Sequence, residues 1–79
     1  MFYVYILHAA AETDRHNVGV TGDLKDRLAR HNGGEVAHTS KYRPWVLDTY
    51  VAFADKAKAY AFEKYLKSGS GRAFAKGHF

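Results

Sequence analysis

The chain has 79 residues, enough for one folded domain that buries only about 60% of the surface of the unfolded chain. It has no cysteine, which excludes disulfide bonds and thiolate zinc sites, so we expect the fold to depend on packing alone. The net charge is +4, and the whole excess lies from Asp55 onward, where six basic residues accompany two acidic ones. A basic segment of this kind is typical of proteins that bind a polyanion such as nucleic acid, although solvated lysines on a helix give the same count.

The first part of the chain predicts a β-hairpin. Residues 2–7 (FYVYIL) are β-branched or aromatic almost throughout, which predicts a strand covered on both faces. Residues 12–16 are polar and predict a turn, and residues 17–21 (NVGVT) predict the returning strand. The apolar run of six residues is too short for a signal peptide or a membrane span. We therefore expect a soluble, unprocessed, cytoplasmic protein with no membrane partner.

A helix and a third strand are predicted next. Asp23 is suited to cap a helix that runs to about His31, and Asn32-Gly33-Gly34 ends it. A polar loop over residues 35–44 leads to a third strand at residues 45–53 (WVLDTYVAF).

The last third predicts two helices. Asp55 is suited to cap a helix that runs to about Lys67, with Gly69 as its C-cap and Ser70 as the N-cap of a short C-terminal helix. The order ββαβα plus this short helix predicts an α+β domain over residues 1–79. Its small, mainly antiparallel three-stranded sheet is flanked by helices.

Each longer helix carries a charged side chain on its apolar face. Arg27 and His31 share one narrow arc of the first helix with Leu24 and Leu28, and Glu63 lies at the edge of the apolar stripe of the second. Burying such a charge costs several kcal/mol unless a partner compensates. Either Arg27 and Glu63 form a structural salt bridge, or both line a cleft that takes a phosphate and a metal ion.

Four segments carry a family resemblance: YVYIL (3–7), NVGVTGDLKDRLARHN (17–32), HTSKYRPW (38–45) and AFEKYLKSGSGRAF (61–74). In this order and spacing they resemble the GIY-YIG nuclease domain, in its small stand-alone bacterial form similar to the N-terminal domain of the excision-repair endonuclease C subunit. The resemblance implies a three-stranded antiparallel sheet flanked by helices. It also implies hydrolysis of DNA phosphodiester bonds with one divalent cation, Mg²⁺ or Mn²⁺, in DNA repair or recombination.

The resemblance also assigns site residues. It places the tyrosine of the first half-motif on Tyr5, the helix arginine and histidine on Arg27 and His31, and the metal-binding glutamate on Glu63. The second half-motif has Asn17 where the family has a tyrosine. Asparagine forms hydrogen bonds but does not transfer a proton at neutral pH. The alternative to an active endonuclease is therefore a catalytically impaired module that only binds nucleic acid.

Two neighbours are candidate replacements for the missing phenol. Tyr3 stands where the first half-motif usually has glycine, and it shares the sheet face of Tyr5 at about 6.6 Å along the strand. Tyr3 is therefore a candidate for partial replacement of the phenol that is missing at Asn17. His16 is expected to point to the opposite face and is a poor replacement.

The matched residue types suit phosphoryl chemistry. The planar guanidinium of Arg27 binds two phosphate oxygens at once, which lysine does not do. One carboxylate, Glu63, suits a magnesium-type ion that keeps most of its waters. Tyr5, with an ordinary pKa of about 10, needs a nearby cation to accept a proton, and His31 lies where it could hydrogen-bond the phenol.

The expected nucleic-acid contacts are His38, Lys41 and Arg43 in the loop and Lys67 and Arg72 near the C-terminus. Because these residues reach only phosphates, we expect structured or branched DNA rather than a specific sequence, with a partner protein supplying specificity. The segment 67–72 (KSGSGR) lacks the Walker pattern, so helix caps are favoured over a phosphate-binding loop.

Other interpretations are compatible with the sequence. Tyr5 could be a core residue, and His31 could interact only with the helix dipole. His31-Asn32 with His38 weakly suggests a His-Asn-His metal nuclease. Tyr42 and Trp45 could stack on unpaired bases, although Trp45 is favoured as a core residue.

Overall fold

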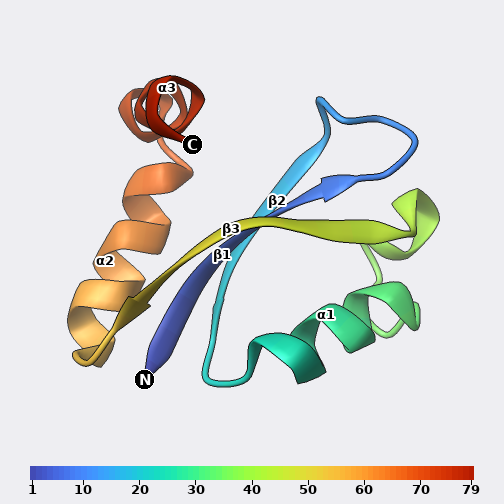
Figure 1. Cartoon of the computed structure of the whole chain (residues 1–79), viewed down its shortest axis with the longest axis horizontal. Helices are drawn as coiled ribbons and strands as arrows, with labels where there is room; N and C mark the ends of the chain where they lie inside the picture. The colour runs from blue at the N-terminus through green and yellow to red at the C-terminus, as the bar shows by residue number, and fades with distance from the viewer.

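The computed structural model describes all 79 residues as a three-stranded sheet with helices on both faces (Figure 1). The elements in chain order are β1 (Phe2–Ala9), β2 (His16–Thr21), α1 (Leu24–Asn32), a 3₁₀ turn η1 (Ser40–Tyr42), β3 (Trp45–Phe53), α2 (Lys56–Leu66) and α3 (Gly69–His78). This confirms the predicted α+β class and element order. None of the helices is both long enough and apolar enough to cross a bilayer.

The sheet is antiparallel, with strand order β2-β1-β3. The central strand β1 is buried on both faces over its four middle residues, from Val4 to Leu7, as its unbroken apolar sequence predicts. Tyr5 is opposite Gly19 of β2 and Tyr50 of β3. Strand β2 is therefore an edge strand whose middle borders Tyr5.

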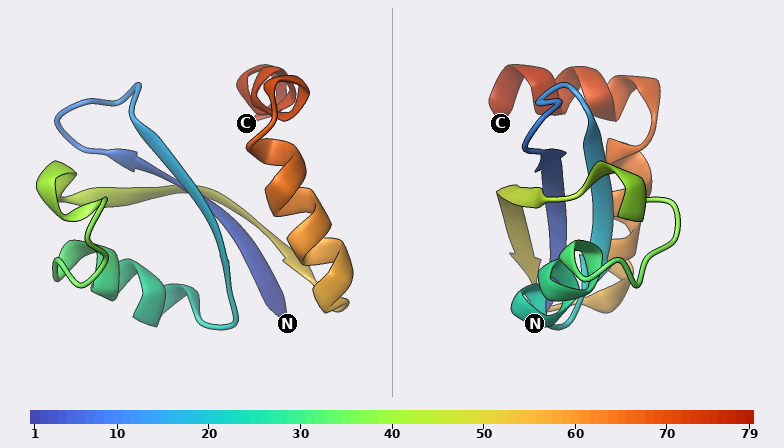
Figure 2. Two further views of the ribbon diagram at one scale, coloured as in Figure 1. Left: turned by 180° about the vertical axis from the view of Figure 1, so that it is seen from behind. Right: turned by 90° about the vertical axis from the view of Figure 1, so that its right-hand side faces the viewer.

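Helix α1 covers one face of the sheet, and α2 and α3 cover the other (Figures 1 and 2). On the α1 side, the core consists of Tyr5, Leu7, Ala9 and Trp45, with Leu24, Leu28, Tyr42 and Leu47 packed around it. On the α2 side, it consists of Val4, Ile6, Ala59 and Leu66. The alternation along β1 thus sends odd-numbered side chains toward α1 and even-numbered ones toward α2.

Helices α1 and α2 begin at the predicted caps. The carboxylate of Asp23 accepts a hydrogen bond from the backbone of Asp26, and that of Asp55 accepts one from the backbone of Lys58. In α1, His31 is buried, and the other predicted members of the stripe are partly buried.

The predicted corner between the last two helices is wrong in detail. Helix α3 begins at Gly69, and its N-cap is Ser68, whose hydroxyl accepts from the backbone of Gly71. Ser70 is therefore not the cap, and the helix runs to His78. A Cβ on Gly71 would overlap the backbone of Tyr65, so this glycine permits a tight helix corner rather than ending a helix.

Candidate active site

Tyr5 is the centre of the candidate site. It lies in the middle of β1, and only 3% of its surface is exposed. Its ring lies over Gly19 of β2, where any Cβ would overlap the phenol hydroxyl. The glycine therefore allows the phenol to extend across the edge strand.

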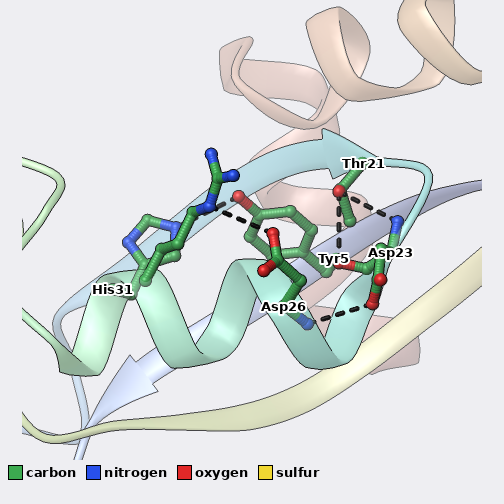
Figure 3. Close-up of polar contacts among 6 residues, drawn as sticks. Tyr5, Thr21, Asp23, Asp26 and His31 are labelled. Atoms are coloured by element: carbon green, nitrogen blue, oxygen red, sulfur yellow. Dashed lines mark hydrogen bonds and ion pairs between the residues drawn. The ribbon is translucent and has the colours of Figure 1, made fainter.

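His31 holds the phenol from α1. Its Nε2 lies 3.1 Å from the Tyr5 hydroxyl, the contact that Figure 3 draws between the two side chains. Its Nδ1 lies 2.9 Å from Oγ1 of Thr39. The predicted hydrogen bond between His31 and Tyr5 is confirmed. A role confined to the helix dipole is wrong, because the imidazole is 2% exposed and bonded through both nitrogens.

Charged groups from both sides of the sheet act on the same hydroxyl. Burial is the largest influence on the pKa of Tyr5 and raises it. The guanidinium of Arg27 and the charge of Lys67 lower this pKa, whereas the charge of Glu63 raises it. Arg27 belongs to α1, whereas Glu63 and Lys67 come from α2 and its C-cap. Charges from both helices therefore influence the pKa of this phenol.

The imidazole of His31 is disposed to be neutral. Burial lowers its pKa, and the positive charges of Arg27 and His38 lower it further. At neutral pH the ring therefore has one protonated and one unprotonated nitrogen.

The structural salt bridge considered between Arg27 and Glu63 is not formed. Glu63 instead pairs with Lys67, whose Nζ lies 3.2 Å from its carboxylate oxygen. The i,i+4 spacing on α2 gives this carboxylate a nearer cation than α1 offers. Arg27 forms no ion pair, whereas Asp26 pairs with Arg30 one turn further along α1. Arg27 is partly buried and has no carboxylate partner.

The donor set fits a divalent ion that keeps its waters. Glu63 is partly buried, with 20% of its side chain exposed, and it is the one carboxylate whose charge reaches Tyr5. No group of three or more histidine, cysteine, aspartate or glutamate side chains is arranged to enclose a metal. A hydrated magnesium-type ion suits one carboxylate, whereas zinc needs three or four protein ligands.

Asn17 lies on the border of a groove beside the site. The groove has a volume of about 860 Å³, and its lining includes Asn17, Lys67, Arg72 and Lys76. Tyr5, Arg27, His31 and Glu63 do not line it. Lys67 pairs with Glu63 and also lines the groove, which lies between the sheet and the helices α2 and α3.

Tyr3 does not take the place of the missing phenol. Its ring packs edge-on against Tyr50 of β3, with the ring centres 5.8 Å apart. Strand β3 is on the opposite side of β1 from β2, so Tyr3 leans away from Asn17. His16 is paired with His8, on the sheet face opposite to Tyr5, as expected.

The loop before β3 exposes its basic side chains. His38, Lys41 and Arg43 are all exposed, which is compatible with contact to a phosphate backbone. Arg43 is partly engaged, since its Nε donates to the backbone of Ser40 at 2.8 Å. Arg72 is also exposed and lines the groove.

The aromatic side chains of this loop are occupied. Trp45 is 3% exposed and donates from Nε1 to the backbone oxygen of Thr39 at 2.9 Å, so it is a core residue and does not stack on bases. The guanidinium of Arg15 covers the ring of Tyr42 at 3.8 Å.

The His-Asn-His interpretation is wrong. Both nitrogens of His31 are engaged by protein groups, so neither is directed toward a metal. The side chain of Asn32 bonds the backbone of Trp45, accepting from its nitrogen at 2.6 Å and donating to its oxygen at 3.1 Å. Thr39 was not among the predicted site residues, and no periodic pattern marks it, because it lies in the loop.

Known sequences resemble this chain over nearly its whole length. The profile of the GIY-YIG catalytic domain matches residues 1–76. A UPF0213 protein of Streptococcus pyogenes serotype M5 (strain Manfredo) is 39% identical over 72 residues, which are 90% of this chain and 76% of the relative. A UPF0213 protein of serotype M3 (strain ATCC BAA-595 / MGAS315) is 38% identical over the same shares. The chain therefore belongs to the GIY-YIG family, whose catalytic domain has a nuclease-type fold.

Proposed function

We propose that the protein is a cytoplasmic endonuclease that hydrolyses DNA phosphodiester bonds with one divalent cation, Mg²⁺ or Mn²⁺. The observation that supports this most strongly is the buried hydrogen bond between the Tyr5 hydroxyl and His31, beside which the charges of Arg27 and Glu63 shift the pKa of the phenol. Arg27 and Glu63 come from opposite faces of the sheet, yet both act on this group. A cation and a carboxylate within electrostatic reach of a proton-transfer group suit phosphodiester hydrolysis.

Tyr5 is proposed to accept a proton from the attacking water. Because burial raises the pKa of this phenol, it keeps its own proton at neutral pH and must pass it on. The neutral His31, 3.1 Å away, accepts the phenolic proton while Tyr5 takes one from water. The water oxygen forms a bond to phosphorus, and the bond from phosphorus to the leaving oxygen breaks. The leaving oxygen takes up a proton from solvent, and the imidazolium later releases its proton to solvent.

Arg27 and Glu63 are proposed to hold the phosphate and the ion. The guanidinium of Arg27, free of ion pairs, binds two non-bridging oxygens and neutralises the charge that grows on them. Glu63 would hold the divalent ion, which would supply positive charge for the phosphate oxygens and the leaving alkoxide. Lys67 is proposed to release Glu63 when the ion binds and to turn to a neighbouring phosphate.

The flanking basic residues are proposed to hold the nucleic-acid backbone. Lys67 and Arg72 lie along the groove, and His38, Lys41 and Arg43 lie on the exposed loop. Such contacts read phosphates and not bases. We therefore propose a structured or branched DNA substrate in repair or recombination, with a partner protein supplying further specificity.

One observation favours a second function. Asn17 replaces the tyrosine of the second half-motif, and neither Tyr3 nor His16 takes its place. If that phenol is required for proton transfer, the chain is a module that binds nucleic acid without cutting it, because its loss removes on the order of 10²–10⁴ in rate.

Incubation with nicked, flapped, branched and single-stranded DNA in the presence of Mg²⁺ or Mn²⁺ separates the two functions. An active endonuclease cuts at least one substrate, and Arg27→Ala or Glu63→Ala abolishes the cut. Matched controls are Arg30→Ala, an exposed arginine of the same helix, and Glu35→Ala, a carboxylate in the loop after α1.

Metal-dependent cutting that survives both site variants indicates a contaminating nuclease. Binding that weakens with salt, without cutting by the wild-type protein or by Asn17→Tyr, supports the binding module and contradicts the endonuclease.

A further inference from the structure

Thr39 is a buried polar side chain in a loop whose basic residues are exposed. It lies between α1 and β3, and its residue is 2% exposed. Its backbone oxygen accepts the indole N–H of Trp45, which attaches the loop to the core. A buried hydroxyl without partners is destabilising, so the partners of this one explain why a threonine is tolerated here.

The Thr39 hydroxyl lies between two groups. Its oxygen is 2.9 Å from Nδ1 of His31 and 3.1 Å from the backbone oxygen of Val36. A carbonyl oxygen only accepts, so the hydroxyl donates its one proton to Val36 and accepts a proton from Nδ1. A neutral imidazole protonated at Nδ1 has its lone pair on Nε2, and Nε2 lies 3.1 Å from the Tyr5 hydroxyl.

The opposite direction of donation leaves a proton without an acceptor. If Thr39 donated to Nδ1, then Nε2–H would donate to the oxygen of Tyr5. The phenolic proton would then have no acceptor in the protein, since His31 is the one acceptor within hydrogen-bond distance of this hydroxyl. The residue is 3% exposed, and the structure otherwise leaves no buried side-chain nitrogen or oxygen without a partner. Donation from Nδ1–H to Thr39 gives an acceptor to each of the three protons, on the Thr39 hydroxyl, on Nδ1 of His31 and on the Tyr5 hydroxyl.

We propose that Thr39 is a positioning residue that holds His31 in its Nδ1–H tautomer, so that Nε2 is the acceptor for the phenolic proton of Tyr5. The catalytic consequence rests on the proposed function, whereas the tautomer does not. When Nε2 takes the phenolic proton, Nδ1–H remains bonded to Thr39, which favours the charged ring. Thr39 thus acts through His31 and does not touch the substrate.

Nitrogen NMR tests the tautomer directly. Long-range ¹H–¹⁵N correlations of ¹⁵N-labelled protein at pH 8 distinguish protonated from unprotonated ring nitrogens of His31. We expect a protonated Nδ1 and an unprotonated Nε2 in the wild-type protein and in Thr39→Ser, which keeps the hydroxyl. Thr39→Val removes the hydroxyl at similar volume, and we expect the Nδ1–H form to be lost or mixed with Nε2–H. Thr13→Val, at an exposed threonine, is the matched control.

A protonated Nε2 in the wild-type spectrum overturns the proposal, as does an unchanged His31 spectrum in a folded Thr39→Val variant. Should Thr39→Val fail to fold, the wild-type and Thr39→Ser spectra decide.

Cleavage supplies the second readout. Loss of a hydrogen bond to a charged group lowers kcat by roughly 10- to 100-fold, so we expect this decrease in Thr39→Val with little change in KM. Thr39→Ser should retain most of the rate. A folded Thr39→Val variant with wild-type kcat overturns the positioning role. If the wild-type protein cuts no DNA, the nuclease function is contradicted and the spectrum of His31 alone decides the tautomer.

Discussion

Gly19 of β2 and Tyr5 of β1 are direct partners in the antiparallel ladder, and the phenol of Tyr5 lies over the glycine. No side chain fits between them, because a Cβ on Gly19 would overlap the hydroxyl. The glycine of the second half-motif therefore has a packing explanation. It sets the position of the phenol relative to the helices that flank the sheet.

Gly19→Ala should displace the phenol from His31. We expect a loss of about 1–3 kcal/mol in the free energy of unfolding, as for other overpacked sites, together with loss of DNA cleavage. Urea unfolding and a cleavage assay measure the two effects. Gly22→Ala is the matched control, since nothing lies within 4 Å of its Cβ position. Wild-type stability and activity in Gly19→Ala would contradict the close packing of the Tyr5 ring on this glycine.

Arg27→Lys tests whether the guanidinium acts as a fork or only as a charge. Lysine keeps the charge but loses the paired donors, so we expect kcat to fall by roughly 10- to 100-fold with little change in stability. Arg30→Lys on the exposed side of α1 should be close to wild type. Equal rates for Arg27→Lys and the wild-type protein would show that only the charge at this position matters.

Periodicity predicted the fold and much of the candidate site. The arc of Arg27 and His31 on α1 followed from the helical repeat, because the residues that share it face the sheet. The strand at residues 45–53 was predicted with the boundaries observed. The helical repeat also marked Glu63 at the edge of the apolar stripe, whereas family motifs supplied Tyr5, whose partner His31 is distant in the chain.

The remaining features depend on contacts that no local pattern encodes. Glu63 pairs with Lys67 rather than Arg27, because the choice among several cations depends on side-chain positions in the folded molecule. The start of α3 was misplaced, because Gly71 serves close packing instead of chain reversal. Thr39 was missed, since its contact with His31 forms only when the loop folds back over α1.

Asn17→Tyr tests whether the second half-motif can be restored. The side chain is partly exposed and borders the groove, which leaves room for a ring. If the missing phenol takes part in proton transfer, the variant should cut DNA faster than the wild-type protein by a factor of roughly 10 to 100. Asn17→Phe, with the ring but no hydroxyl, is the control. An equal gain in both variants would assign the effect to packing.

Lys67→Met tests the competition for Glu63. Removing the cation that pairs with the carboxylate should strengthen Mn²⁺ binding by about two- to fivefold, which is the effect expected for a surface ion pair. Calorimetric titration with Mn²⁺ measures this change. Lys64→Met, an exposed lysine one residue after Glu63, is the control. Weaker Mn²⁺ binding in Lys67→Met, or no Mn²⁺ binding that depends on Glu63, would contradict the assignment of this carboxylate.

His31 should make the stability of the protein fall in mild acid. Burial and the charges of Arg27 and His38 lower its pKa in the folded state below the ordinary value of 6.5. Below about pH 6.5 the unfolded chain therefore binds a proton at this residue that the native protein does not bind. The contribution of His31 is complete above that pH, and the free energy of unfolding falls as the pH drops toward the folded pKa.

His31→Gln removes this proton-binding site. The variant should be less stable than the wild-type protein at every pH, since the bonds to Tyr5 and Thr39 are lost, but its stability should depend less on pH between about 7 and 5. Urea unfolding at several pH values gives the slope of the free energy of unfolding against pH. These slopes, and not the absolute stabilities, are compared between the variants. His78→Gln, at the exposed end of α3, removes an imidazole outside the network as the control. Equal slopes for His31→Gln and the wild-type protein would show that His31 takes up its proton equally in the folded and unfolded chains, contrary to its burial between Tyr5 and Thr39.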